Sequence, residues 1–579
     1  MPFLYIRTGG KCDIMRKYVS LLLAGAMVVG SLSGCGSAFE EESQTTAAVT
    51  AGEGSSDTQA SQESVGGTEA VSQTAPGGNM LHIPAKREFP TVDTQKDTEF
   101  YVVPLNIYDR LVECEVVDGV AEIVPSLAES WTVSDDGLVY TFHLRDDVTF
   151  HNGEKLTADD VVYTIDRMMD PDTGARNTDA FSMIKGAKAR LDGQADGVEG
   201  AVALDENTVE LTLEAPFGPF LANLATPACS IYNRKATEAA GDQFGIDPQV
   251  TVGTGPFKMS DWVLNDKLTM VRNDDYFKGA PKLDGIEVIQ VPDENTQKLM
   301  YENGELDIVD LSSSSSQLGY FLENDAYKDN LVTGPEAGSY FYVFNQDMKP
   351  TDDVRVRKAI SMAIDRQTIL DQMYSGAGHL VNSMLPDGVL GAYDAQEIPY
   401  DPEGARALLA EAGYSDGCEL EICQQTDNPD ALAINQVVQS MLSQVGITVT
   451  IKQMDDAAYF AERKEGRLGM TRASWKADFN DPDNFLYTFF TERNAKIRSN
   501  NHKNTDVYQW LEDARAMVDE DERMALYQKI DTAVVQDDAA VLPLFQMDHI
   551  VVVQDWVKDF HVAWNGWTDV SYYTVSLEK

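Results

Sequence analysis

Residues 127–171 read LAESWTVSDDGLVYTFHLRDDVTFHNGEKLTADDVVYTIDRMMDP, and this stretch carries clear secondary-structure signals. Its middle part, LVYTFHLRDDVTF (138–150), predicts two short strands around a turn. The segment TADDVVYTIDRMM (157–169) predicts a helix that Thr157 caps, with two aspartates in the first turn, where acidic side chains favour the helix dipole. A strand pair followed directly by a helix indicates a mixed α/β fold.

The alternation of strand and helix patterns continues towards the C-terminus. Further strands are predicted at NTVELTLEAP (207–216), KLTMVRN (267–273) and GITVTIKQM (446–454). Amphipathic or capped helices are predicted at VRVRKAISMAIDRQTILDQMY (354–374), DPEGARALLAEAGY (401–414) and ALAINQVVQSMLSQV (431–445). The helix from 401 has Pro402 near its first position and Gly413 where a terminating glycine is expected. GTGPF (253–257) predicts a structural turn that leads into a strand.

The N-terminal segment predicts export from the cell. Arg16 and Lys17 precede the apolar run YVSLLLAGAMVVGSLSGCG, which is too short for a membrane span and ends in small residues, so we expect a signal peptide over 1–34. The tetrad Leu32-Ser33-Gly34-Cys35 resembles the lipobox of bacterial lipoproteins, which implies that Cys35 carries a lipid. Residues 35–84 are rich in Ser, Thr, Gly, Ala and Glu, and we expect them to form a flexible tether.

Composition limits the classes of partner and fold. The full chain has a net charge of −49, and removal of residues 1–34 leaves 41 basic and 93 acidic residues, a net charge of −52. Such a surface excludes nucleic acid and anionic lipid headgroups as expected partners. The part after the tether, about 490 residues, is too long for one hydrophobic core and should divide into two or three lobes.

Metal, disulfide and catalytic patterns are missing from the sequence. Cys418 and Cys423 lie five positions apart in a predicted strand and therefore on opposite faces, which disfavours a disulfide or a shared metal. The seven histidines form no zinc motif, so no metal or cofactor is expected. The nucleophile-elbow, phosphate-loop and dinucleotide motifs are also absent, so we expect no catalytic residue.

Several long motifs together resemble one family. The stretch at 127–171, VGTGPFKM (252–259), NDDYFKGAPKLDGIEVI (273–289), ENGELDIV (302–309) and YFYVFNQDMKPTDDVRVRKAISMAIDR (340–366) are similar, in this order, to family 5 of the extracellular solute-binding proteins of ABC importers. The resemblance implies a periplasmic-binding-protein-like α/β fold of type II, with two lobes joined by a hinge and an additional third domain. It further implies domain I at 85–111, 221–335 and 546–579, domain II at 112–220 and domain III at 336–545.

The segment RASWKADFNDP (472–482) resembles the ligand-binding segment of the oligopeptide receptors in that family. The resemblance implies that Asp478 binds the α-ammonium of a peptide and that Arg472 is available to its carboxylate, although a protein partner for Arg472 is an open alternative. Residues 472 and 478 share a parity, so in a regular strand they face one way, about 20 Å apart at Cα.

The peptide backbone is expected to pair with this strand. Ala473 to Ala477 would hydrogen-bond the ligand main chain, with Trp475 as pocket wall or core residue and Lys476 as a charge beside the ligand. The opposite wall is expected at Tyr101-Val102-Val103-Pro104, in an edge-strand conformation. In HVAWNGWTD (561–569), the two tryptophans line the cleft or belong to a buried strand.

The predicted function is therefore that of a lipid-anchored extracytoplasmic receptor that captures oligopeptides. Its partners would be a peptide, a membrane-embedded ABC permease and the ATPase subunits of that permease, and the receptor itself would be a monomer. The alternatives are the same fold binding another solute, such as an oligosaccharide, a nickel chelate or haem, and a secreted lipoprotein peptidase.

Overall fold

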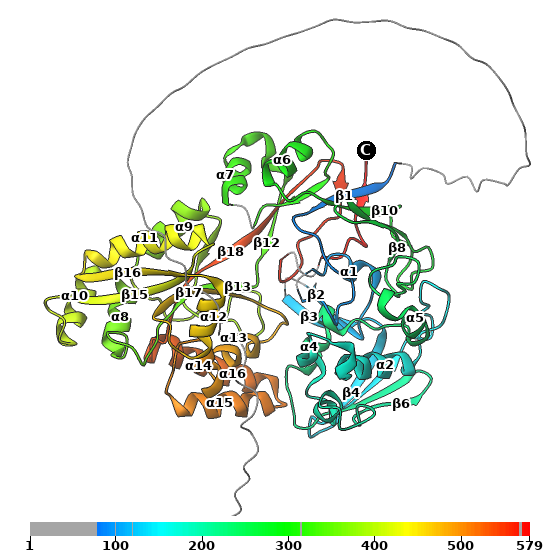
Figure 1. Ribbon diagram of the computed structural model, residues 1–579, viewed down its shortest axis with the longest axis horizontal. Coiled ribbons are helices and arrows are strands. Elements are labelled where there is room, and N and C mark those ends of the chain that lie inside the picture. The colour runs from blue at the N-terminus through cyan, green and yellow to red at the C-terminus, as the bar shows by residue number, and fades with distance from the viewer. Residues whose placement is uncertain (1–77, 99, 118–119, 313–314, 567–569) are drawn as a thin grey trace, which may run out of the picture. The chain divides into compact units, whose positions relative to one another are not determined.

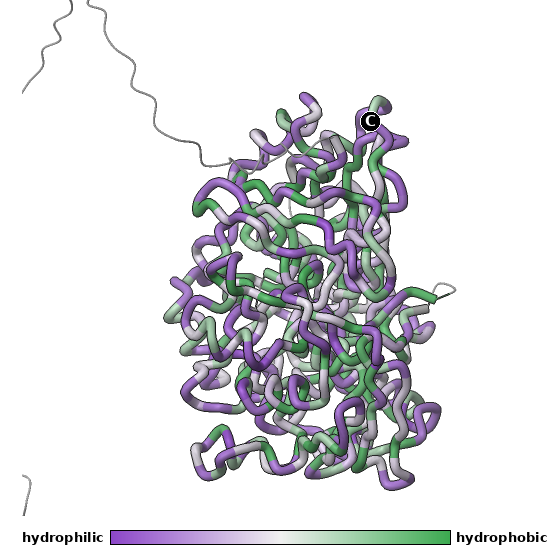
Figure 2. Tube along the Cα trace, turned by 90° about the vertical axis from the view of Figure 1, so that its right-hand side faces the viewer, coloured by the Kyte–Doolittle hydropathy of each residue, from purple (hydrophilic) through white to green (hydrophobic). Residues whose placement is uncertain are grey.

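The computed structural model describes residues 78–98, 100–117, 120–312, 315–566 and 570–579. The predicted signal peptide, Cys35 and most of the predicted tether lie outside these residues. Within them, no helix is both long and apolar enough to cross a membrane. Figure 2 shows apolar and polar residues interleaved along the trace, as expected where each element has one buried face.

A four-stranded sheet joins the first described strand to strands from the middle of the chain (Figure 1). Its order is β1 (Met80–Ala85), β10 (Gly285–Gln290), β9 (Lys267–Arg272) and β8 (Phe257–Val263). The core beside it includes Leu81, Ile286 and, from the C-terminal part of the chain, Val551 and Tyr572. Near the C-terminus, β19 (Val557–Lys558) pairs with β20 (Ser576–Leu577).

The GTGPF turn is confirmed, since β8 begins at Phe257. Glycine is required at two of its positions. A Cβ at Gly253 would lie 1.9 Å from the carbonyl oxygen of Ile107, and one at Gly255 would lie 2.5 Å from its carbonyl carbon. The glycines therefore let this turn lie directly on the backbone of α1 (Pro104–Ile107).

A second four-stranded sheet forms from the 127–171 stretch and the strands that follow it. The order is β4 (Ala128–Val133), β5 (Val139–Leu144), β7 (Thr208–Thr212) and β6 (Ala201–Asp205), preceded by the hairpin of β2 (Val112–Val117) and β3 (Val120–Pro125). The predicted helix is confirmed as α2 (Ala158–Met169), and the Asp160 carboxylate accepts hydrogen bonds from Thr157 at its start. The second strand predicted within 138–150 was wrong, because Thr149 makes only one isolated bridge, to Lys155.

The largest sheet contains eight strands from the second half of the chain. They are β11 (Ile308–Asp310), β12 (Leu331–Pro335), β13 (Gly338–Val343), β14 (Gly378–Leu380), β15 (Cys418–Gln425), β16 (Ile447–Met454), β17 (Met470–Lys476) and β18 (Val541–Val553). The long β18 pairs with β13 through 541–545 and with β12 through 548–552. β18 therefore runs from the part of the sheet that contains β13 into the part that contains β12.

Helices cover both faces of this sheet. Residues of α8 (Val354–Ala363), α9 (Arg366–Tyr374) and α11 (Pro429–Ser443) form one core with Tyr342, Ile422 and Met470. Residues of α13 (Asp483–Phe490), α15 (Thr505–Ala516) and α16 (Glu520–Thr532) form another with Phe341 and Val343. Because neighbouring β13 residues point to opposite faces, these are the α9 face and the α13 face of the sheet.

Eight other α-helices complete the described chain. They are α3 (Ala187–Leu191), α4 (Phe220–Leu224), α5 (Arg234–Ala240), α6 (Glu294–Glu302), α7 (Ser315–Glu323), α10 (Pro402–Glu411), α12 (Asp456–Lys464) and α14 (Glu492–Ile497).

The single helix predicted over 354–374 is two helices, α8 and α9. Ile364 is extended (ψ 114°), and the Asp365 side chain accepts a hydrogen bond from the backbone N–H of Thr368, so it caps a new helix. The other two predictions are confirmed, and Gly413 has a φ of +93° just after α10. Cys418 packs against the core that contains α9, whereas Cys423 belongs to a separate small core, so their opposite orientation is confirmed.

Candidate ligand-binding site

Asp478 lies in a pocket of about 350 Å³ that we call the Asp478 pocket. One wall is Lys476 to Phe479, and the other walls come from segments far away in the sequence. These segments contribute Thr98, Tyr101, Arg176, Asn177, Asp179, Ala180, Asn223, Thr226, Pro227, Ala228 and Asn565. The pocket thus combines cations, anions and amides, the set of groups that a zwitterionic ligand needs.

Three larger pockets lie elsewhere in the described chain. One of about 540 Å³ is lined by residues between His379 and Ala395, and one of about 490 Å³ by residues between Tyr487 and Glu512. The third, about 670 Å³, is lined by parts of β2 and β12 and by 561–564, so it adjoins the Asp478 pocket across the Trp564–Asn565 peptide. Volume alone does not select a site, and the Asp478 pocket differs from these three in containing Asp478 and the side chain of Asn565, whose Oδ1 is unpartnered within the described residues.

Asn484 at the start of α13 holds the Asp478 carboxylate in place. Its Nδ2 donates to Asp478 Oδ2 at 3.1 Å, and its Oδ1 accepts from the backbone N–H of Asp478 at 3.1 Å and from Trp475 Nε1 at 2.9 Å. The Asp478 side chain is exposed to the solvent of the pocket, yet protein surrounds it on most sides. This partial burial raises the pKa of Asp478, while the hydrogen bond from Asn484 and the charge of Arg498 act in the opposite direction.

Trp475 belongs to the support of the site and does not line the pocket. The Arg498 guanidinium lies 4.8 Å from the ring centroids of both Trp475 and Phe489, and burial lowers the pKa of Arg498 to about 10. Neither Arg498 nor Asn484 is among the site residues predicted from the sequence. The acidic DPDN segment gave no sign that its asparagine bridges the tryptophan and the aspartate.

The strand before Asp478 has an open edge. β17 pairs with β13 along its length from Thr471 to Lys476, but it pairs with β15 only at Met470 and Thr471. Within the described chain, the edge from 472 to 476 therefore has no strand partner. Ala473 packs its methyl group against the core on the α13 face, and Ala477 is buried and donates its N–H to Ala337 at 2.8 Å.

The two cations of the segment already have protein partners. Lys476 pairs with the buried carboxylate of Glu336 at 3.1 Å. Arg472 donates to the Tyr374 hydroxyl at 2.9 Å and lies 5.2 Å from the Tyr340 ring centroid, outside the residues that line the pocket.

The predicted common orientation of Arg472 and Asp478 was wrong. β17 ends at Lys476, so the alternation of its side chains does not continue to Asp478. Arg472 lies on the α9 face of the sheet, whereas Asp478 contacts Asn484 of α13.

The predicted strand at 101–104 was also wrong, although Tyr101 does line the pocket. Val103 has helical dihedrals (φ −73°, ψ −51°) and is completely buried as the residue before α1. Pro104 occupies the first helical turn, where its fixed φ and missing N–H fit better than in a strand. Val103 therefore supports the wall from behind.

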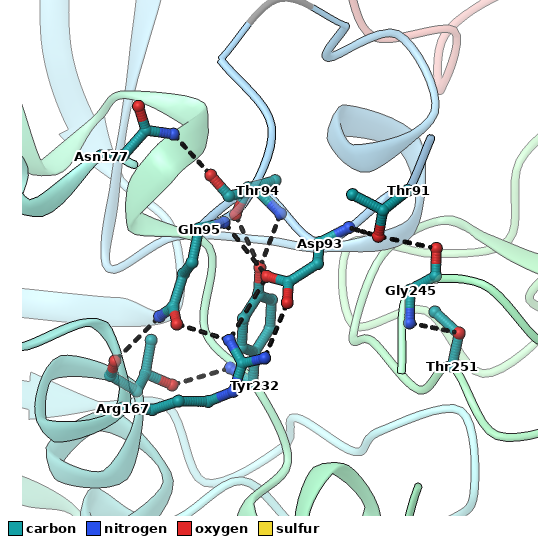
Figure 3. A network of polar contacts seen from close by, with 10 residues as sticks. Thr91, Asp93, Thr94, Gln95, Arg167, Asn177, Tyr232, Gly245 and Thr251 are labelled. Carbon is teal, nitrogen blue, oxygen red and sulfur yellow. Dashed lines mark hydrogen bonds and ion pairs between the residues drawn. The ribbon is translucent and has the colours of Figure 1, made fainter. Parts of the chain in front are cut away.

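A buried polar network fixes this wall (Figure 3). Asn177 donates to the carbonyl oxygen of Thr94 at 2.6 Å and also to that of Asp97 at 2.9 Å. Behind Thr94, the Asp93 carboxylate pairs with Arg167 of α2 at 2.7 Å and accepts from the Tyr232 hydroxyl at 3.1 Å. These hydrogen bonds and the ion pair thus connect the pocket wall to the cores of the two four-stranded sheets.

Comparison with known proteins identifies the family. Residues 122–496 match the model of the bacterial extracellular solute-binding proteins, family 5. The chain is 30% identical to the heme-binding protein A of Haemophilus influenzae over 83% of this chain and 88% of that protein, and 30% identical to the dipeptide-binding protein of Escherichia coli over 79% and 87%. The solved structure of a periplasmic murein tripeptide binding protein in an unliganded open form matches with a TM-score of 0.76, at 26% identity over 86% of this chain and 98% of that one. These matches confirm the predicted fold class, a periplasmic-binding-protein-like α/β fold, and the chain belongs to family 5 of the bacterial extracellular solute-binding proteins.

Proposed function

We propose that this protein binds short peptides by their free α-ammonium group and delivers them to an ABC importer. The relatives support a peptide as the solute, because two of the three compared proteins are named for binding a dipeptide or a murein tripeptide. The importer would consist of a membrane-embedded permease and separate ATPase subunits, and the receptor would act as a monomer without catalytic activity.

The observation that carries this proposal is the open strand edge directly before Asp478. A peptide can add to the edge of 472–476 through its main chain, which gives affinity without reading side chains. At the end of that edge, Asp478 offers a partly desolvated carboxylate whose only direct side-chain partner among the described residues is a neutral amide. A desolvated carboxylate favours a charged partner, and the α-ammonium of a peptide is one.

A double-mutant cycle tests the role of Asp478. Asp478→Asn keeps the shape of the side chain and removes its charge, and we expect it to weaken binding of trialanine by about 2–5 kcal/mol, since a charge would lose its partner in a closed pocket. N-acetylation of the peptide should weaken binding to the unsubstituted protein by a similar amount. The variant should no longer distinguish the two peptides in calorimetry.

Asp387→Asn is the matched control, because Asp387 is an exposed carboxylate that pairs with His379 at the protein surface and does not line the Asp478 pocket. It should bind both peptides like the unsubstituted protein. Independent, additive losses from acetylation and from Asp478→Asn would show that Asp478 is not the partner of the amine.

A second candidate is another solute, since one relative is named for binding haem. Native mass spectrometry of the purified protein separates these possibilities by the mass that it carries. Haem, a nickel chelate or an oligosaccharide in place of peptides would overturn the peptide proposal. Cleavage products after incubation with peptides would instead support the peptidase alternative.

We further propose that Cys35 carries a lipid that anchors the protein to the outer face of the cytoplasmic membrane. Cys35→Ser should move the protein from the membrane fraction to the soluble fraction, because no acyl chain could then be attached. Fractionation and immunoblotting measure this. Cys229→Ser is the control, because Cys229 is a buried thiol, and it should stay with the membranes. A Cys35→Ser protein that still needs detergent for release would contradict the anchor.

A further inference from the structure

A tight turn near the C-terminus places Asn565 in the wall of the Asp478 pocket. The backbone N–H of Gly566 donates to the carbonyl oxygen of Ala563 at 3.0 Å, and Gly566 has a φ of +95°. A Cβ at Gly566 would lie 2.8 Å from Nδ1 of His549, so the turn needs glycine there. Trp564 is buried in the core on the α13 face, which fixes the other side of Asn565.

Asn565 is itself an unsatisfied polar residue. The residue is 4% exposed, and its Oδ1 atom is buried without a hydrogen-bond partner in the part of the chain that the structure describes. Buried side-chain oxygens nearly always accept a hydrogen bond, and an exception needs an explanation. Since Asn565 lines the pocket, its buried oxygen is explained if a bound ligand supplies the donor.

The chemistry of the proposed ligand supplies such a donor. A primary ammonium carries three N–H groups, and at Asp478 one carboxylate oxygen, Oδ2, already accepts from Asn484. The carboxylate supplies the charge, but it does not supply acceptors for all three N–H groups of the ammonium. The orphaned Oδ1 of Asn565, in the wall of the same pocket, is a neutral acceptor for a second N–H.

We propose that Asn565 accepts a second hydrogen bond from the ligand's ammonium, so that Asp478 and Asn565 together select charged amines with at least two N–H groups. This inference rests on the proposed pairing of Asp478 with the ammonium. Asp478 would distinguish charged from uncharged amines, and Asn565 would distinguish amines by their number of N–H groups. Peptides with a primary amine or an N-terminal proline would qualify.

Methylated peptides separate the two roles. N-monomethyl trialanine keeps the charge and two N–H groups, whereas N,N-dimethyl trialanine keeps the charge and only one. We expect the unsubstituted protein to bind free and monomethylated trialanine with affinities within about threefold of each other. The dimethylated peptide should bind at least about tenfold more weakly, because one hydrogen bond to a charged group is lost. The monomethylated peptide controls for the added bulk.

Variants at position 565 complete the test by calorimetry. Asn565→Leu has a similar shape but no acceptor, so it should bind the mono- and dimethylated peptides about equally. Asn565→Asp keeps an acceptor and should restore the preference. Asn207→Leu, in the turn between β6 and β7 and outside the pocket, should behave like the unsubstituted protein.

Two outcomes would overturn the inference. One is an equal loss for mono- and dimethylated peptides in the unsubstituted protein, a result that needs no variant. The other is a folded Asn565→Leu protein that keeps the full preference. Failure of the underlying function looks different, because N-acetyl trialanine would then bind as well as trialanine.

Discussion

Three aspartates within the segment ADFNDPDN have three different environments. Asp481 pairs with the buried Arg523 at 2.7 Å, and Asp483 pairs with Arg515 at 2.8 Å. Asp478 forms no ion pair within the described residues and is held by an amide. At the residue scale, the carboxylate that we propose to bind the ligand is thus distinguished by the absence of a cationic partner, and the sequence alone does not show which aspartate that is.

Unpaired charged groups of the pocket also predict which cation meets the carboxylate of a peptide. The exposed side chain of Arg176 lines the Asp478 pocket and has no ion pair in the described chain, whereas Arg472 is engaged with Tyr374 outside the pocket. We expect C-terminal amidation of trialanine to weaken binding about tenfold, or about 1.4 kcal/mol. Arg176→Gln should abolish this difference in calorimetry, because the other cation that lines the pocket, Lys476, is already paired with Glu336.

Arg472→Gln serves as the comparison for Arg176→Gln and should keep the preference for the free carboxylate. The reverse result, with the preference lost in Arg472→Gln and kept in Arg176→Gln, would return the carboxylate to β17, as the sequence resemblance implied.

At the scale of elements, local signals predicted most helices and strands but not which strands pair with one another. The cap at Thr157 and the proline at the first position of α10 are properties of a few adjacent residues, so α2 and α10 were predictable. The break between α8 and α9 was missed because apolar spacing continues across Ile364, although Asp365 is a good cap. The open edge of β17 depends on where β15 stops pairing, which no local pattern contains.

The pairing of α2 with the N-terminal segment gives a prediction at this scale. Arg167→Met leaves the Asp93 carboxylate buried without its cation, and we expect the free energy of unfolding to fall by about 3–5 kcal/mol. The double variant Asp93→Asn with Arg167→Met should lose less than Arg167→Met alone, because no charge is then stranded. Urea unfolding followed by circular dichroism measures both.

Arg234→Met is the control, because Arg234 of α5 forms an exposed pair with Glu238 at 3.0 Å. Its loss should cost at most about 1 kcal/mol. If Arg167→Met costs no more than Arg234→Met, the network in Figure 3 does not hold α2 to the N-terminal segment.

At the scale of the whole molecule, the chain passes between β12 and β13 within residues 336–337, and β18 bridges the same two strands. We propose that these two connections form the hinge between domain I (85–111, 221–335 and 546–579) and domain III (336–545), with domain II at 112–220. Two short connections permit rotation of one lobe relative to the other.

The last prediction follows from such a hinge and from a ligand that contacts both sides of the pocket. Closure on saturating trialanine should reduce the radius of gyration in small-angle scattering, since a ligand held by β17 and by the wall of Tyr101 and Asn177 favours the state in which both can touch it. The protein must first be unfolded and refolded to remove peptide carried through purification. Asp478→Asn, at a peptide concentration that saturates only the unsubstituted protein, should keep the larger radius. Equal radii for the stripped and the saturated unsubstituted protein would show that ligand binding does not close the lobes, and the hinge at 335–338 and 545–548 would then have to be abandoned.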